Sequence, residues 1–165
     1  MANKKITQWR AISFNLFRSP VFYVTKLLRH IDAIAREKQR DVLSISFHPL
    51  NWGDFEDSSW KGYDHRQDLR RTEVLAWLDE HDISWEECGP VASETCIRCY
   101  LGEIYLDILF DEADPRYQLV RDYLENPEGT MRNEQVRFFY LPLEHAMRNA
   151  HHDEPGFWEK WADTF

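Results

Sequence analysis

The segment TCIRCYLGEIYLDILF, residues 95–110, constrains the fold of this chain more than any other stretch. Two runs with strand-like alternation flank the pair Gly102-Glu103, and a Gly-X pair is typical of a type II′ hairpin turn, whose first central residue requires a positive φ. A two-residue loop would fix the strand register, so that Leu101 faces Ile104. The sequence therefore predicts a β-hairpin here, with one wholly apolar face in the core and a second face half covered by an N-terminal helix.

The CxxC pair inside this segment does not predict a metal or redox site. In a single strand, Cys96 and Cys99 would project to opposite faces. A zinc ribbon needs a second CxxC, which the sequence lacks, and three cysteines without a secretory signal argue against a disulfide framework. We expect reduced thiols with structural roles.

The remaining periodic segments alternate between the two kinds of secondary structure. Strands are predicted at residues 12–17, 42–47, 83–88 and 136–141, and helices at 20–38, 64–81, 115–127 and, as two short pieces, within 143–163. In the helix at 20–38, Arg36 is expected on the outer face. From residue 42 the order is strand, helix, the two strands of the hairpin at 95–110, helix, strand, which predicts an α+β fold with a ferredoxin-like βαββαβ core over about residues 42–141.

One domain accounts for the whole chain, because 165 residues with 43% hydrophobic and 30% charged residues lie in the range of a single globular unit. Within residues 1–165 we expect a basic β-α extension at 1–41, the core at 42–142 and a C-terminal helical tail at 143–165. The sequence has no apolar run of about 18 residues and no signal peptide, so the prediction is a cytoplasmic protein that does not enter membranes.

Charge is distributed unevenly along the chain. The formal net charge is −9, but residues 1–40 carry +7 and residues 41–165 carry −16. The basic helix could lie on its own acidic body, or each pole could face a separate partner. A strongly acidic body argues against direct nucleic-acid binding, in which the neutralisation of phosphates dominates, and favours a basic protein partner.

The segment HPLNWGDFEDSSWKGYDH, residues 48–65, has neither helical nor strand periodicity. It is longer than most connections in a compact domain, and its large aromatic residues argue against disorder. We expect a protein-recognition loop at 49–63; the alternative is a loop folded over the edge of its own core. The spacing of its carboxylates does not match an EF-hand calcium loop. The predicted protein-binding residues are Trp52, Asp54, Phe55, Glu56, Asp57, Trp60 and Tyr63.

A group of histidines near the C-terminus is the only cluster that could ligate zinc or iron. It comprises His145, His151 and His152, followed by Asp153. No HExxH or comparable spacing is present, so a structural role is favoured and no metal or cofactor is predicted. His48, at the end of a predicted strand beside the long loop, could line a pocket together with these histidines.

Catalytic motifs are absent from the sequence: it has no GxSxG elbow, Walker A loop, GxGxxG or kinase signature. The favoured function is therefore not enzymatic. We expect protein-protein binding of the inhibitor, immunity, chaperone or adaptor type through the loop at 49–63. Two alternatives remain open: a small-ligand or metal-dependent enzyme or binder near His48 and the C-terminal histidines, and a homo-oligomer that pairs through Trp158 and Trp161.

Overall fold

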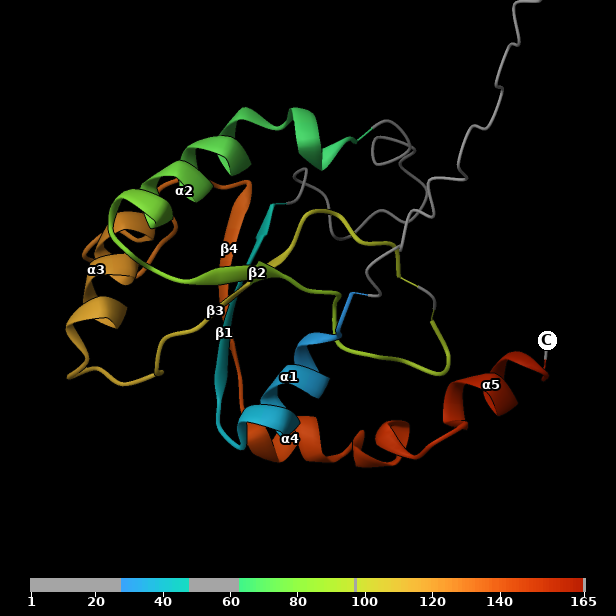
Figure 1. Cartoon of the computed structure of the whole chain (residues 1–165). Coiled ribbons are helices and arrows are strands. Elements are labelled where there is room, and N and C mark those ends of the chain that lie inside the picture. Colours follow the sequence, from blue (N-terminus) through green and yellow to red (C-terminus); the bar gives the residue numbers. More distant parts are fainter. Residues whose placement is uncertain (1–27, 48–62, 97, 165) are drawn as a thin grey trace, which may run out of the picture.

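The computed structural model describes residues 28–47, 63–96 and 98–164, which form a mixed α+β structure (Figure 1). Four strands make an antiparallel sheet in the order β2-β3-β1-β4. The strands are β1 (Val42–Phe47), β2 (Trp85–Glu87), β3 (Ile104–Leu106) and β4 (Val136–Leu141). The α-helices are α1 (Ile31–Lys38), α2 (Leu69–Glu80), α3 (Pro115–Leu124), α4 (Leu143–Met147) and α5 (Phe157–Ala162), and two 3₁₀ turns are η2 (His65–Gln67) and η3 (Ala150–Asp153).

Helices α2 and α3 cover one face of the sheet (Figure 1). Each begins at an aspartate whose carboxylate accepts a backbone N–H of the first turn, Asp68 from Arg70 and Asp114 from Arg116. Pro115 occupies the first turn of α3, where its missing N–H costs nothing. The apolar core between these helices and the sheet contains Leu43, Ile45, Phe47, Val74, Leu78, Ile83, Ile104, Leu106, Ile108, Tyr117, Val120, Leu124 and Val136.

Helices α1 and α4 pack together on the other face of the sheet (Figure 1). The second apolar cluster lies here and consists of Ile31, Ile34, Ala35, Val42, Cys88, Tyr105 and Ala146. Burial raises the pKa of the Cys88 thiol to about 12, which keeps it protonated and unreactive at neutral pH. This cysteine therefore belongs to the core.

The predicted hairpin at residues 95–110 is wrong. β3 pairs with β2, with Trp85 opposite Leu106, and no strand is present among the described residues between 95 and 103. Gly102 does have the expected positive φ of 94°, but its carbonyl accepts a hydrogen bond from Arg71 Nε at 2.8 Å instead of a partner strand. The Gly102 carbonyl is thus held by a side chain of α2.

Cys96 and Cys99 are consequently exposed and lie outside any strand, so their predicted projection from one strand is also wrong. The neighbouring Leu101 donates its N–H to the Glu103 carboxylate at 2.7 Å. The segment between β2 and β3 is a long loop. Its backbone groups bond to side chains and to other backbone groups, as the Cys88 N–H does to the Glu103 carbonyl at 3.2 Å.

The first described helix starts later than predicted. Residues 28–30 precede it, and His30 forms a parallel bridge with Gly89 and occupies the N-cap position of α1. Arg36 was expected on the outer face, but it is buried, with an exposure of 6%. The predicted strand at 12–17 and the predicted helical residues 20–27 lie outside the described residues.

The other element predictions are confirmed. The strands at 42–47 and 136–141 are β1 and β4 with the predicted ends, and the two short C-terminal helices are α4 and α5. The strand at 83–88 is the shorter β2, and the helix at 115–127 is α3, which ends at Leu124. The predicted helix at 64–81 is divided into η2 and α2, because Asp68 interrupts it and caps the second part. Among the described residues, no helix combines the length and apolarity that crossing a bilayer requires.

Candidate functional site

Most of the predicted recognition loop lies outside the described residues, including Trp52, Asp54, Phe55, Glu56, Asp57 and Trp60. Tyr63 is described, and its hydroxyl donates a hydrogen bond to Asp68 Oδ2 at 2.8 Å. Burial and this hydrogen bond to a carboxylate raise the pKa of Tyr63 above its usual value. Tyr63 is thus fixed to the cap of α2, and its role in binding stays a prediction.

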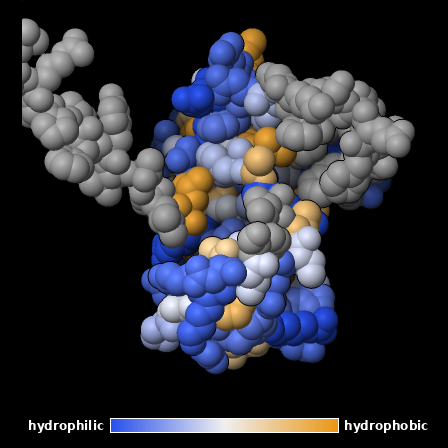
Figure 2. Space-filling model, turned by 90° about the vertical axis from the view of Figure 1, so that its right-hand side faces the viewer, coloured by the Kyte–Doolittle hydropathy of each residue, from blue (hydrophilic) through white to orange (hydrophobic). Residues whose placement is uncertain are grey.

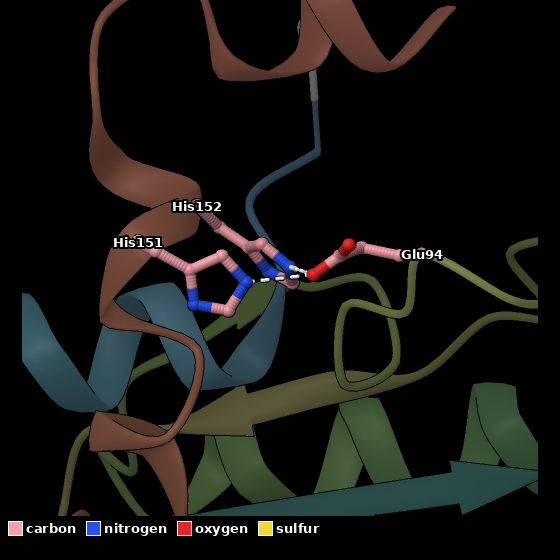
Figure 3. Close-up of side chains that lie close together, drawn as sticks. All are labelled: Glu94, His151 and His152. Atoms are coloured by element: carbon pink, nitrogen blue, oxygen red, sulfur yellow. Dashed lines mark hydrogen bonds and ion pairs between the residues drawn. The ribbon is translucent and has the colours of Figure 1, made fainter. Parts of the chain in front are cut away.

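Three side chains from distant parts of the chain converge near the C-terminus (Figure 3). Glu94 comes from the long loop after β2, and His151 and His152 come from η3. Glu94 Oε1 lies 2.6 Å from His151 Nε2 and 3.1 Å from His152 Nε2. One ligand atom from each residue lies within 4.8 Å of those of the other two, which is close enough for all three to contact one metal ion.

A buried polar network holds η3 and the loop of Glu94 against α1. Arg36 donates from Nε and a terminal nitrogen to both carboxylate oxygens of Asp153, at 2.6 and 2.7 Å, and from its other terminal nitrogen to Asp32 at 2.9 Å. Asp32 also accepts the Ala92 N–H and the Asn149 amide, both at 2.9 Å. Because Asp32 is fully buried, these hydrogen bonds hold both the loop of Glu94 and η3 firmly on α1.

Aromatic rings surround the inner histidine. The ring of His152 lies 4.8 Å from that of Phe157 and 4.7 Å from that of Trp158, centroid to centroid. Trp161 Nε1 donates to the carbonyl of Glu94 at 3.1 Å and links α5 to the same loop. His152 is only 6% exposed, and its buried Nδ1 has no hydrogen-bond partner among the described residues.

The three members of the cluster differ in their access to solvent. The side chains of Glu94 and His151 are each 45% exposed, whereas that of His152 is 3% exposed. Hydrogen bonds from His151 and His152 lower the pKa of Glu94, so its carboxylate is ionised at neutral pH. The arrangement is an anionic oxygen shared by two imidazoles, open to solvent on one side.

The sequence singled out part of this site. His151 and His152 do lie together, but Asp153 turns away to Arg36, and His145 is exposed on α4, outside the group of three. His48 lies outside the described residues. Glu94 was missed because it belongs to no motif and is 57 positions from His151, so only the fold brings the two together.

A second candidate site is an aromatic surface on β4, which is the last strand at one end of the described sheet. Phe139 and Tyr140 are 46% and 52% exposed, and Phe110 stacks on Tyr140 with the ring centroids 4.4 Å apart. Phe139 pairs with Ser44 and Tyr140 with Leu43, so the two rings project to opposite faces of the sheet. We call Phe110, Phe139 and Tyr140 the β4 aromatic patch.

Figure 2 shows one face of the molecule. There, hydrophilic residues cover most of the surface, and hydrophobic residues form small separate groups. Phe110 and Tyr140 are exposed together on one face of β4, and Phe139 is exposed on the other face. Exposed apolar surface of this kind is found at interaction sites.

Comparison of the chain with protein-family models, curated proteins and solved structures finds no match.

Proposed function

We propose that this protein acts by binding another protein, as an inhibitor, immunity factor, chaperone or adaptor does. The observation that carries this proposal is the β4 aromatic patch, in which Phe110, Phe139 and Tyr140 are exposed beside a terminal strand. Aromatic side chains supply a large share of binding energy at protein interfaces, because each removes much apolar area from water with few rotatable bonds.

The proposed partner contributes an extended segment that pairs with β4. A terminal strand presents unpaired N–H and C=O groups, and an added strand can satisfy them while its side chains contact the aromatic rings. β4 spans six residues, VRFFYL, and contains no proline that would interrupt such pairing.

Charge supports a basic partner. Residues 41–165 carry a net charge of −16, and the exposed residues Asp111 and Glu112 directly follow Phe110. A basic segment laid along β4 would therefore meet carboxylates at the rim of the aromatic patch. The predicted recognition loop, with Trp52, Asp54, Phe55, Glu56, Asp57, Trp60 and Tyr63, is proposed as a second contact with the same partner.

Affinity capture with the full chain tests this proposal. The bait carries Phe110→Ser, Phe139→Ser and Tyr140→Ser together, and the matched control carries Leu69→Ser and Leu119→Ser, which change exposed apolar residues on helices. We expect one basic protein to be captured by the wild-type chain and the control, and to be lost from the patch variant while circular dichroism shows an intact fold. Equal capture by a folded patch variant would refute the proposed surface.

The loop is tested separately by replacing Trp52, Phe55 and Trp60 together. Loss of the captured partner with an unchanged far-ultraviolet spectrum would support the loop as a contact. A variant that unfolds would instead show that these aromatic residues belong to the core.

We infer further that the core belongs to the ferredoxin-like class. What supports this is the order β1-α2-β2-β3-α3-β4, in which neighbouring strands are all antiparallel and both helices pack on the same face. An experimental structure that places another strand between β3 and β1 would contradict the assignment. The class carries no activity with it, because ferredoxin-like domains perform unrelated functions.

A metal-dependent activity is the second candidate function. The observation that favours it is the convergence of Glu94, His151 and His152, since two imidazoles and a carboxylate are also the ligand set of catalytic zinc sites. This candidate function requires first that the three residues bind a metal ion.

A further inference from the structure

We propose that Glu94, His151 and His152 form a binding site for one divalent transition-metal ion of the zinc type. This inference goes beyond protein binding through β4 and does not depend on it. The three side chains offer two imidazole nitrogens and one carboxylate oxygen, the donors that suit zinc and its neighbours in the first transition row.

All three ligand atoms lie within 4.8 Å of one another, and the two distances to Glu94 require only a small adjustment for a metal. Zinc bonds of about 2.0 to 2.2 Å at tetrahedral angles separate neighbouring ligand atoms by about 3.3 Å. Glu94 Oε1 and His152 Nε2 are already 3.1 Å apart, and Glu94 Oε1 and His151 Nε2 must open from 2.6 Å. Because the side chains of Glu94 and His151 are half exposed, they can rotate by this amount without moving the core.

Protons occupy the same positions that a metal would take. An ionised carboxylate can only accept hydrogen bonds. In the hydrogen-bonded cluster each histidine Nε2 therefore carries the proton that it donates to Glu94. Metal binding through Nε2 moves that proton to Nδ1 of each ring, so neutral histidines bind without a net release of protons. The bonds formed are one from each Nε2 and one from the carboxylate.

The buried inner histidine gives an independent indication. His152 is only 6% exposed, and its Nε2 faces Glu94. Its Nδ1 has no hydrogen-bond partner among the described residues. A histidine held by Phe157 and Trp158 with one nitrogen directed at a carboxylate is a pre-oriented ligand.

The same unpartnered nitrogen sets the expected strength of the site. Metal-bound histidines normally donate their second N–H to an oxygen, and losing such a partner lowers metal affinity by about 10-fold to 100-fold. His152 Nδ1 lacks one among the described residues, so we expect a site weaker than that of a closed structural zinc centre. Three protein ligands also leave one coordination position for water or for a group of another molecule.

A metal at this site would connect two segments that are far apart in the sequence. Glu94 belongs to the loop after β2, and both histidines belong to η3 between α4 and α5. The hydrogen bond of Trp161 to the Glu94 carbonyl already joins α5 to this loop. The ion would therefore fix the C-terminal segment more firmly on the body of the protein.

Isothermal titration of the metal-free full chain with zinc chloride tests the site. Glu94→Gln and His151→Ala change exposed ligands and should leave the fold intact, whereas His152 is too buried to be a clean test. The matched controls are His145→Ala and Glu144→Gln, which change an exposed histidine and an exposed carboxylate on α4. Cobalt titration of the same variants reports coordination through its visible spectrum.

We expect one zinc ion per wild-type chain, binding weakened by at least about tenfold in Glu94→Gln and in His151→Ala, and unchanged binding in both controls. The cobalt complex of the wild-type chain should show the intense bands of tetrahedral coordination. Absence of saturable binding would overturn the proposal. Equal weakening in His145→Ala would overturn it as well, because the zinc would then be bound by surface histidines in general.

Discussion

Replacement of Arg36 by methionine should destabilise the protein more than the loss of any surface ion pair. Arg36 lies in the interior and bonds the fully buried Asp32 at 2.9 Å, the Ala146 carbonyl at 2.9 Å and both oxygens of Asp153. Methionine keeps most of the volume of the side chain and removes the charge and all of these donors.

The expected loss of stability in Arg36→Met depends on the charge that stays buried after the substitution. Asp32 keeps the Ala92 N–H and the Asn149 amide but loses its cation, and an uncompensated buried charge costs about 3 to 5 kcal/mol. Asp153 is half exposed and can rehydrate, so its lost pair adds no more than about 1 kcal/mol. For a protein of this size, the first of these losses lowers the melting temperature by about 6 to 20 °C.

Urea unfolding at pH 7, followed by tryptophan fluorescence and by circular dichroism, measures the effect. The control is Arg148→Met, which removes an exposed arginine 3.9 Å from Glu144 and should cost less than about 0.5 kcal/mol. A second variant, Asp32→Asn in the Arg36→Met background, removes the unpaired charge but keeps an acceptor for the Ala92 N–H. It should therefore recover part of the lost stability.

An Arg36→Met variant as stable as Arg148→Met would refute this reasoning, and so would additive effects of the Arg36 and Asp32 substitutions. The pH dependence gives a further check. Burial alone would raise the pKa of Asp32, but its three hydrogen bonds and the charge of Arg36 lower it overall. The contribution of Asp32 is thus present above its ordinary pKa of 3.8 and is lost as the pH falls below that value.

Three further predictions concern the fold that carries the sites. Gly102→Ala should cost about 2 kcal/mol or more in urea unfolding, because φ is +94° and the new Cβ would lie 2.5 Å from the Cβ of His65. Asp68→Ala should lower the free energy of unfolding by about 2 kcal/mol at pH 7. Burial opposes ionisation of Asp68, but its hydrogen bonds lower its pKa to about 2. The difference in stability from wild type should therefore shrink as the pH falls from about 4 to about 2. Trp77→Leu should remove about 1 kcal/mol of stacking with Tyr123, whose ring lies 3.9 Å away, and a double-mutant cycle with Tyr123→Leu measures that coupling.

Local signals explain the parts of the fold that the sequence predicted well. Helix α3 begins at Asp114 and Pro115 because a cap and a first-turn proline act within a few residues, and both are visible in the sequence. β1 and β4 are runs of strand-forming residues, and short-range pattern is enough to locate them. β1 and β4 pair with each other although they are about 100 positions apart in the sequence. The order of elements suggested this pairing, and the structure specifies its register, with Val42 opposite Leu141.

The hairpin failed because strand pairing depends on the whole fold, which a local pattern does not determine. The positive φ at Gly102 was predicted correctly, yet β3 pairs with β1 and β2, and the Gly102 carbonyl accepts a hydrogen bond from Arg71 on α2. Arg71 is 8% exposed, and nothing in the sequence distinguishes it from the arginines on the surface. The burial of Arg36 was missed for the same reason.

The candidate sites show the same division. The adjacent histidines were visible, but Glu94 reaches them only through the docking of η3 on the loop, which depends on Asp32, Arg36 and Asn149. On β4, the run of strand-forming residues predicted a strand but not the exposure of its two aromatic residues, because exposure depends on how the whole fold packs around the strand.

Native mass spectrometry of the untagged full chain, purified gently from its own host, is the most direct test of the central proposal that this protein binds a basic protein through β4. We predict a stoichiometric complex for the wild-type chain and its loss when Phe110, Phe139 and Tyr140 are replaced by serine together. A bare wild-type chain, or a complex that persists in the folded triple variant, would contradict it.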